Sequence, residues 1–138
     1  MPVTVLIGAQ WGDEGKGRYV DFLASQADVV ARYAGGDNAG HTVAVDDAVY
    51  KMHLIPSGVL HPGVVSVLGN GMVINPVKLL REMDRLLQMG VHITPENLRI
   101  STQAHIITAA HIEYDRASEA ARGTEAIGTT LRGIGPAY

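Results

Sequence analysis

Short apolar runs alternate with stretches of helical periodicity along this chain. Four runs have the length and the β-branched or aliphatic character of buried strands, and they cover residues 3–7, 28–33, 64–71 and 97–101. Residues 41–45 and 49–55 flank Asp46 and Asp47, and this arrangement predicts a β-hairpin. Because strands and helical periods alternate, the pattern predicts an α/β fold with a substantially parallel central sheet and flanking helices.

The first helical period begins at about Lys16, where Val20, Leu23 and Ala24 recur at helical spacing. This helical period follows the apolar run at 3–7 and a glycine-rich loop. The amino-terminal segment is therefore predicted to form a strand, a loop and a helix, which is the arrangement around a phosphate-binding loop. The run at 28–33 then completes a β-α-β unit, which is expected to be right-handed.

The clearest helix is predicted between Asn75 and Gly90. Asn75 is a good N-cap, Pro76 suits the first helical position, and Gly90 is a stop signal. The apolar residues expected on its buried face are Val77, Leu80, Met83 and Leu87. A second long helix is predicted over residues 106–123. The glycine-rich residues 124–138 have no period and are predicted to form a functional loop, or a segment that leads into a further part of a protein.

Composition indicates one globular domain and excludes several classes of protein. The chain has 138 residues, of which 46% are hydrophobic and 18% charged, and a net charge of −3. The chain lacks the basic stripe that would indicate a nucleic-acid partner, and its apolar runs are shorter than a membrane span requires. The absence of cysteine excludes disulfides, and no basic targeting region precedes the first apolar run, so we expect a cytoplasmic protein.

The loop "GAQWGDEGKG" (8–17) carries the strongest chemical signal. Its glycines can turn backbone N–H groups toward one point at a helix N-terminus, where Lys16 also favours phosphate oxygens. A P-loop would place Ser or Thr after the lysine to bind magnesium, but Gly17 stands there. Asp13 and Glu14 would repel a phosphate unless a cation intervenes, so an acid here indicates magnesium binding, general-base work, or both. The dinucleotide fingerprint is not met, because its third glycine is missing.

Two further glycine-rich loops carry candidate ligand-binding groups. "GGDNAGHT" (35–42) follows a predicted strand and would place Asn38 and His41 at the ligand-binding edge of the sheet. "IGTTLRGIGP" (127–136) offers hydroxyls and Arg132 to a second phosphate, although ordinary turn chemistry explains it equally well. The other five histidines show no zinc-binding spacing, and no serine sits in a nucleophile elbow.

Five stretches together resemble the adenylosuccinate synthetase family, in the order and spacing of that family. They are "QWGDEGKG" (10–17), "GGDNAGHT" (35–42), "HLIPSG" (53–58), "GNG" (69–71) and "IGTT-RGIGPAY" (127–138). The resemblance implies a GTP-dependent ligase that joins IMP to L-aspartate in purine biosynthesis, through a 6-phosphoryl-IMP intermediate and with Mg²⁺. It also implies a homodimer.

The resemblance also implies roles for individual residues. Asp13 would be the general base and His41 the general acid, and Lys16 would serve the transferred phosphate. Magnesium would be held by Asp13 and by the carbonyl of Gly40. The implied GTP contacts are Gly12, Asp13, Glu14, Gly15, Lys16, Gly17, Arg18, Gly40, His41 and Thr42. The implied IMP contacts are Asp13, Glu14, Gly15, Lys16, Asn38, Ala39, Gly40, His41 and Thr129.

The chain departs from the family pattern at two positions and in length. Arg18 stands where the family has lysine, and Leu131 stands where glycine or lysine is commoner. A phage relative that makes a modified purine lacks the base, so Asp13 favours the ordinary enzyme. Family members are several times longer, so residues 1–138 are expected to be the amino-terminal part of one nucleotide-binding domain, inactive alone. The alternatives are a noncatalytic nucleotide-phosphate-binding fragment and an unrelated P-loop phosphotransferase, which would not explain "DNAGHT".

Overall fold

The computed structural model describes residues 2–9, 15–45 and 48–138. In chain order its elements are α1 (Lys16–Ala24), β1 (Val29–Gly35), β2 (His41–Val45), β3 (Ala48–Met52), η1 (Ser57–Leu60), β4 (Val65–Ile74), α2 (Pro76–Gln88), β5 (Leu98–Ile100), β6 (His105–Ile106), α3 (Ala109–Arg122), η2 (Gly123–Glu125) and α4 (Ile134–Ala137).

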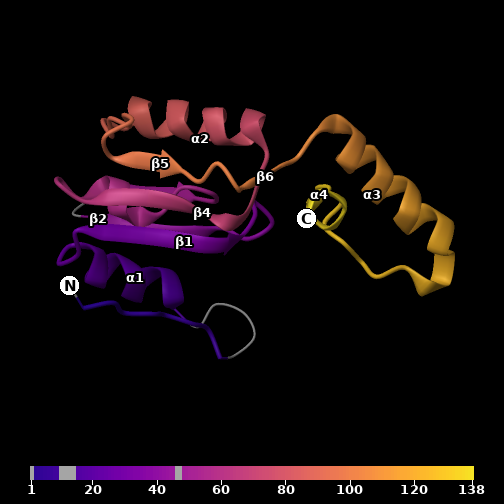
Figure 1. Ribbon diagram of the computed structural model, residues 1–138, viewed down its shortest axis with the longest axis horizontal. Helices are drawn as coiled ribbons and strands as arrows, with labels where there is room; N and C mark the ends of the chain where they lie inside the picture. The colour runs from indigo at the N-terminus through magenta and orange to yellow at the C-terminus, as the bar shows by residue number, and fades with distance from the viewer. Residues whose placement is uncertain (1, 10–14, 46–47) are drawn as a thin grey trace.

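The central sheet is parallel, as the alternating pattern predicts. β4 lies in its middle and pairs in parallel with β1 on one side, through the register Val29↔Val65. It also pairs in parallel with β5 near its start and with β6 near its end. Figure 1 shows α2 and α1 on opposite sides of these strands, with α3 and α4 set apart beyond the end of the sheet. The predicted α/β class is therefore confirmed.

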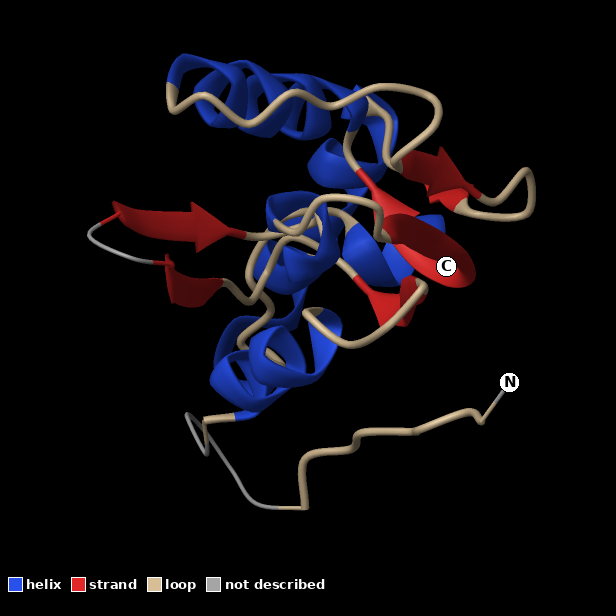
Figure 2. Cartoon of the chain, turned by 90° about the vertical axis from the view of Figure 1, so that its left-hand side faces the viewer, coloured by secondary structure: helices blue, strands red, loops and turns tan. Residues whose placement is uncertain are grey.

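The predicted hairpin is also confirmed. β2 and β3 pair antiparallel from His41↔Met52 to Val45↔Ala48, and their connection at residues 46–47 lies outside the described residues. Figure 2 shows this hairpin projecting away from the main sheet. Val43 and Met52 anchor it, because both are buried in the apolar core that underlies β4 and α2.

The amino-terminal strand predicted at residues 3–7 is not formed. Residues 2–9 have no regular structure, and Val3, Val5 and Ile7 are 87%, 71% and 70% exposed. Apolar β-branched residues favour extended backbone, but a strand also needs a neighbouring backbone to complete its hydrogen bonds. The segment runs beside α1 instead of beside β1 (Figure 1), so the first strand of the predicted β-α-β unit is missing while its helix is present.

Helix α2 begins as predicted but buries a different face. The side chain of Asn75 accepts a hydrogen bond from the backbone N–H of Lys78 at 3.2 Å, and Pro76 occupies the first turn. The predicted apolar face is wrong, since its members Val77, Leu80 and Leu87 are more than half exposed and Met83 is half-buried. The buried face is formed by Leu79, Glu82 and Leu86. The helix has apolar residues on two sides, and the helical period alone did not distinguish them.

Glu82 fixes α2 to the core although it is charged. Its side chain accepts hydrogen bonds from the backbone N–H groups of His53 at 2.8 Å, Leu54 at 3.0 Å and Ile55 at 3.3 Å. Glu82 is 3% exposed, so an unpaired carboxylate here would be strongly unfavourable. Three N–H donors and the nearby positive charge of Arg32 compensate for this burial. The segment after β3 is thereby held against α2.

The carboxy-terminal helix is shorter than predicted. α3 begins at Ala109 because residues 105–106 pair with β4 as β6, and Thr108 forms a capping box with His111. It ends before Gly123, where the stop signal was predicted. The stretch 124–138, predicted to lack regular structure, includes the end of η2 and the short helix α4.

We expect the substitution Glu82→Gln to destabilise the protein by about 2 kcal/mol. The glutamine amide offers only one acceptor oxygen, and its NH₂ group would face a backbone N–H that needs an acceptor. Chemical denaturation monitored by circular dichroism measures the change. The control is Glu113→Gln, because the Glu113 side chain is 70% exposed in its ion pair with Arg116. That change should alter stability by less than about 0.5 kcal/mol, and equal effects of the two variants would contradict the interpretation.

Candidate functional site

The first predicted loop leads into α1 through a glycine that needs its conformational freedom. Gly15 is the N-cap residue and has φ +80°, a left-handed conformation that side chains disfavour. Lys16 follows as the first helical residue, and no acid lies in the first turn of the helix. The helix N-terminus therefore offers N–H groups and a lysine to an anion. The predicted site residues Gly12, Asp13 and Glu14 lie outside the described residues.

A shallow pocket of about 420 Å³ adjoins this helix start. Gly15, Lys16 and Arg18 line it together with the aromatic side chains Tyr19 and Phe22 and two residues of the amino-terminal segment. The side of α1 that carries the predicted phosphate-binding cations is thus open and partly apolar.

The first and second predicted loops meet at Gly17 and His41. A Cβ atom on Gly17 would lie 2.9 Å from the Cβ of His41 and 3.5 Å from its Cγ. His41 therefore rests directly on the backbone of the glycine that replaces the P-loop hydroxyl residue. This contact joins the two motifs across the start of α1 and β2, as a shared ligand site requires.

The environment of His41 favours its neutral form. Burial lowers the pKa of the His41 imidazole below its usual range, and the positive charge of Arg32 lowers it further, with a smaller contribution from His53. The carboxylates of Glu82 and Asp21 oppose these effects without reversing them. In the protein alone, His41 is thus a neutral hydrogen-bond donor, and an anionic phosphate beside it would favour protonation.

Arg32 of β1 holds the backbone at the base of the second loop by hydrogen bonds. Its guanidinium donates hydrogen bonds to the carbonyl oxygens of Gly36, at 2.8 Å, and of His53. The loop residues predicted to contact ligands, Asn38, Ala39, Gly40 and Thr42, are exposed. Gly40 leaves room for the ring of His53, which would lie 3.0 Å from a Cβ at that position. The loop is therefore rigid at its base and open where ligand contacts are predicted.

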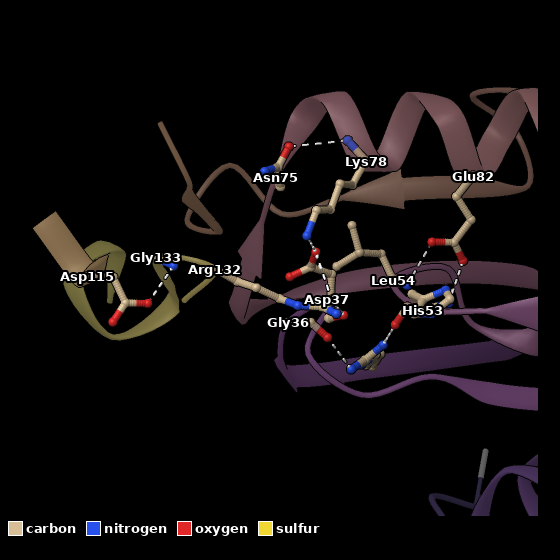
Figure 3. A network of polar contacts seen from close by, with 11 residues as sticks. Gly36, Asp37, His53, Leu54, Asn75, Lys78, Glu82, Asp115, Arg132 and Gly133 are labelled. Carbon is tan, nitrogen blue, oxygen red and sulfur yellow. Dashed lines mark hydrogen bonds and ion pairs between the residues drawn. The ribbon is translucent and has the colours of Figure 1, made fainter. Parts of the chain in front are cut away.

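Asp37 lies between these exposed residues and the core, and it is 1% exposed. It forms an ion pair with Lys78 of α2, and Arg132 approaches the same carboxylate oxygen to 3.4 Å (Figure 3). Arg132 also donates a hydrogen bond to the Asp37 carbonyl. The 127–133 loop is joined to the second loop through Asp37.

Two acids of α3 hold the third predicted loop. Glu119 accepts hydrogen bonds from the backbone N–H groups of Ile127, Gly128 and Thr129, at 3.2, 2.7 and 3.1 Å. Burial opposes ionisation of Glu119, but these three donors prevail and lower its pKa. Asp115 accepts from the Thr129 hydroxyl and from the Gly133 N–H, both at 2.9 Å. The Thr129 hydroxyl thus points to α3 in this structure, and it is Arg132 that reaches the second loop.

Leu131, one of the two positions at which the chain departs from the expected family pattern, takes a backbone conformation that glycine adopts without strain. Its φ of +54° lies in the left-handed region, and it is the single non-glycine residue with positive φ among those described. Such a conformation costs a leucine about 1 kcal/mol or more relative to glycine. The bonds from Asp115 and Glu119 on either side hold the loop in this shape.

The "GNG" stretch serves packing. A Cβ on Gly69 would lie 2.9 Å from the Cα of Tyr33, and one on Gly71 would lie 2.7 Å from the Tyr33 carbonyl oxygen. The register of β1 against β4 shifts at this point, between Arg32 and Ala34. These glycines allow the two strands to approach closely at the bulge, which positions the loop that follows β1.

Several residues that organise the site were not predicted from the sequence, namely Arg32, Asp37, Lys78, Glu82, Asp115 and Glu119. The sequence does contain an indication for Glu82. It lies between Leu79 and Leu86 on one helical face, and an acid buried on that face would need a hydrogen-bonding or charged partner. The ion pairs of Asp37 join segments far apart in the sequence, and no local pattern indicates them.

Residues 2–9, 15–45 and 48–138 contain no cluster of three or more His, Cys, Asp or Glu side chains that could hold a metal ion. None of the helices in these ranges has both the length and the hydropathy needed to cross a bilayer.

Comparison with known proteins gives one consistent result. A family model described as adenylosuccinate synthetase matches residues 5–138. The adenylosuccinate synthetase of Streptococcus sanguinis is 56% identical and that of Lacticaseibacillus casei 57% identical over all 138 residues, which correspond to 32% of each relative. The chain therefore spans about a third of the length of these curated relatives.

Solved structures agree with the sequence matches. The fully ligated adenylosuccinate synthetase of Plasmodium falciparum superposes with a TM-score of 0.80 at 44% identity, covering 94% of this chain and 30% of that one. A cyanophage succinoaminodeoxyadenylate synthetase, bound to dGMP and to dATP as an energy donor, gives a TM-score of 0.69 at 27% identity, covering 93% of this chain and 34% of that one.

The substitution Gly17→Ala tests the contact between the two loops. We expect a loss of about 1–3 kcal/mol in stability, because the new methyl group would overlap His41 near its backbone. Gly135→Ala is the matched control, since a Cβ there meets no atom within 4 Å and its φ is not positive. Thermal and chemical denaturation compare the two. A Gly17→Ala protein as stable as the control would show that the contact is not tight.

His41 is expected to titrate below 6.5, its ordinary value, when its ring proton signals are followed by NMR against pH. Its folded-state pKa is lowered, so the unfolded chain binds this proton more readily. Its contribution to stability is therefore fully present above about pH 6.5 and is lost as the pH falls from there through the lower folded-state pKa. Wild type should lose more stability than His41→Asn on acidification through this range. A midpoint at or above 6.5 would contradict the interpretation.

Proposed function

Because the chain belongs to the adenylosuccinate synthetase family, we propose that it carries the base, the general acid and the phosphate-binding loop of a GTP-dependent ligase that joins IMP to L-aspartate. The products would be adenylosuccinate, GDP and phosphate, in purine biosynthesis. The observation that carries the proposal is the packing of His41 on Gly17, which brings the two motifs with the proposed catalytic residues into contact.

The proposed chemistry assigns a task to each group. Asp13 removes the proton from the purine ring nitrogen, and the oxyanion formed attacks the γ-phosphate of GTP. Lys16 and the N–H groups at the start of α1 bind the phosphates, while His41 donates a hydrogen bond where charge develops on the β- and γ-phosphates. The amino group of aspartate then displaces phosphate from 6-phosphoryl-IMP. A neutral lactam oxygen is a poor nucleophile, which is why a positioned base is needed.

The remaining contacts follow the same proposal. The exposed residues Asn38 and Ala39 would contact IMP, with Thr129 after its hydroxyl leaves Asp115. Gly12, Glu14 and Gly15 would contribute to the phosphate cradle, and Arg18, Gly40 and Thr42 to GTP binding. These assignments require the third loop to adjust when the nucleotide binds, while Arg132 and Asp37 keep it beside the second loop.

Magnesium fits the chemistry of the proposed ligands. Mg²⁺ prefers carboxylate and carbonyl oxygens. Gly40 is exposed and directly precedes His41, which packs on Gly17 at the start of α1. Asp13 and the Gly40 carbonyl would hold the ion, which would neutralise phosphate charge during transfer. A homodimer is also proposed, as the resemblance implies.

A second function rests on the extent of the match, which covers 32% of the curated relatives. On this alternative the 138 residues bind nucleotide phosphates without catalysing ligation. Both functions predict GTP binding that depends on Lys16. Only the first predicts that adenylosuccinate forms from GTP, IMP, L-aspartate and Mg²⁺ in a protein containing this chain.

The substitution Asp13→Ala separates catalysis from binding. We expect it to reduce adenylosuccinate formation at least about 100-fold, because the general base is lost, while GTP binding by calorimetry stays within a few-fold, because Lys16 and the loop amides remain. The control Asp84→Asn changes an exposed acid on α2 and should leave both unchanged. A near-normal rate for Asp13→Ala would remove this residue from the mechanism.

A further inference from the structure

A second cluster of cations lies on α2, outside the proposed nucleotide loops. Lys78, Arg81 and Arg85 follow one another at spacings of three and four residues, so they occupy one helical face. Together with Arg132 they line a pocket of about 320 Å³. Lys16, Gly17, His41 and Thr129 do not line this pocket. Asp37 of the second loop and Arg132 of the third loop do line it, so the pocket adjoins the proposed nucleotide loops without including those four groups.

Two acids line the same pocket, but both are already engaged. Glu82 is 3% exposed and accepts three backbone hydrogen bonds. Asp37 pairs with Lys78 and Arg132 through a single oxygen, Oδ2 (Figure 3). Four cations thus face two carboxylates, and the pocket keeps an excess of positive charge.

Arg81 and Arg85 carry that excess. Both are exposed, and neither forms an ion pair with any described residue. Like charges four residues apart destabilise a helix. Arg85 gains some stability from its place in the last turn, near the negative end of the helix dipole, but Arg81 lies mid-helix and gains none. Two guanidinium groups that share a pocket form a fork for a phosphate or carboxylate.

Asp37 adds a different signal. Its Oδ1 atom is fully buried and has no hydrogen-bond partner within the described part of the chain. A buried carboxylate oxygen normally accepts at least one hydrogen bond. Because Asp37 also lines the pocket, a ligand bearing a hydroxyl could supply that bond. The site therefore calls for an anionic group beside a hydroxyl-bearing portion.

We propose that this pocket binds a small phosphate ester that carries hydroxyl groups, such as a sugar phosphate. Arg81 and Arg85 bind the phosphate, and Asp37 accepts a hydrogen bond from a hydroxyl. The volume of about 320 Å³ suits a molecule of this size. His53 and Asp37, which belongs to the second loop, both line the pocket, so an occupant lies against the base of that loop.

The test is calorimetric titration of the chain with ribose 5-phosphate, inorganic phosphate and ribose. We expect saturable binding of ribose 5-phosphate, weaker binding of inorganic phosphate, and none of ribose. The double substitution Arg81→Gln/Arg85→Gln should weaken ribose 5-phosphate binding at least about tenfold, since two charge-assisted contacts are lost. The matched control Arg99→Gln/Arg122→Gln removes two exposed arginines elsewhere and should bind as wild type does.

Three outcomes would overturn the proposal. They are no saturable binding to wild type, binding within twofold of wild type for the Arg81→Gln/Arg85→Gln protein, and equal affinity for inorganic phosphate and ribose 5-phosphate. Asn38→Ala separates this site from the proposed substrate loop and should leave ribose 5-phosphate binding intact. If Asn38→Ala loses binding and the α2 double variant does not, the ligand binds in the substrate loop. That result would contradict this proposal and would leave the proposed function unaffected. Denaturation midpoints equal to wild type confirm that the variants are folded.

Discussion

The burial of one carboxylate, that of Asp37, constrains how the predicted loops can be arranged. An ion in that position is tolerated only when cations face it, and the two that do so come from α2 and from the loop before α4. Arg132 binds both the side chain and the backbone of Asp37. Moving either partner away would leave the buried charge facing a single cation. The cost of that outcome keeps the 127–133 loop beside residues 36–41 although α3 and α4 lie beyond the end of the sheet.

A second buried carboxylate, that of Glu82, is likewise tolerated because donors face it. Glu82 binds the backbone of residues 53–55, and Arg32 binds the carbonyl oxygens of Gly36 and His53 from the sheet. The base of the second loop and residues 53–55 are thereby fixed, while Asn38, Ala39, Gly40 and Thr42 remain exposed. Pre-organised backbone of this kind lowers the cost of ordering a site when a ligand binds. Burial, with the positive charge of Arg32 added to it, lowers the pKa of His41 beside this loop.

The sequence predicted the parallel sheet and the start and end of α2, because these follow from local signals: β-branched runs, an Asn-Pro start and a glycine stop. It failed where two solutions fit the same local pattern. Residues 3–7 have strand composition, but they lie beside α1 without a strand partner. On α2 the period allowed two faces, and the choice of the face with Glu82 depended on donors in residues 53–55. The candidate site was predicted as motifs, whereas the ion pairs that assemble it were not, since they join residues far apart in the chain.

The glycines of the family-like motifs separate into two physical classes, and this separation decides which of them can be read as ligand contacts. Gly69 and Gly71 meet the backbone of Tyr33 and serve the close approach of β1 and β4, so packing accounts for them without a ligand. Gly15 meets nothing within 4 Å and is required only for its backbone conformation at the start of α1, which leaves its surface free for an anion. Gly17 combines both demands, because its missing side chain makes room for His41 at the helix start. The contact between the first two loops therefore depends on position 17 more than on the number of glycines in the first loop.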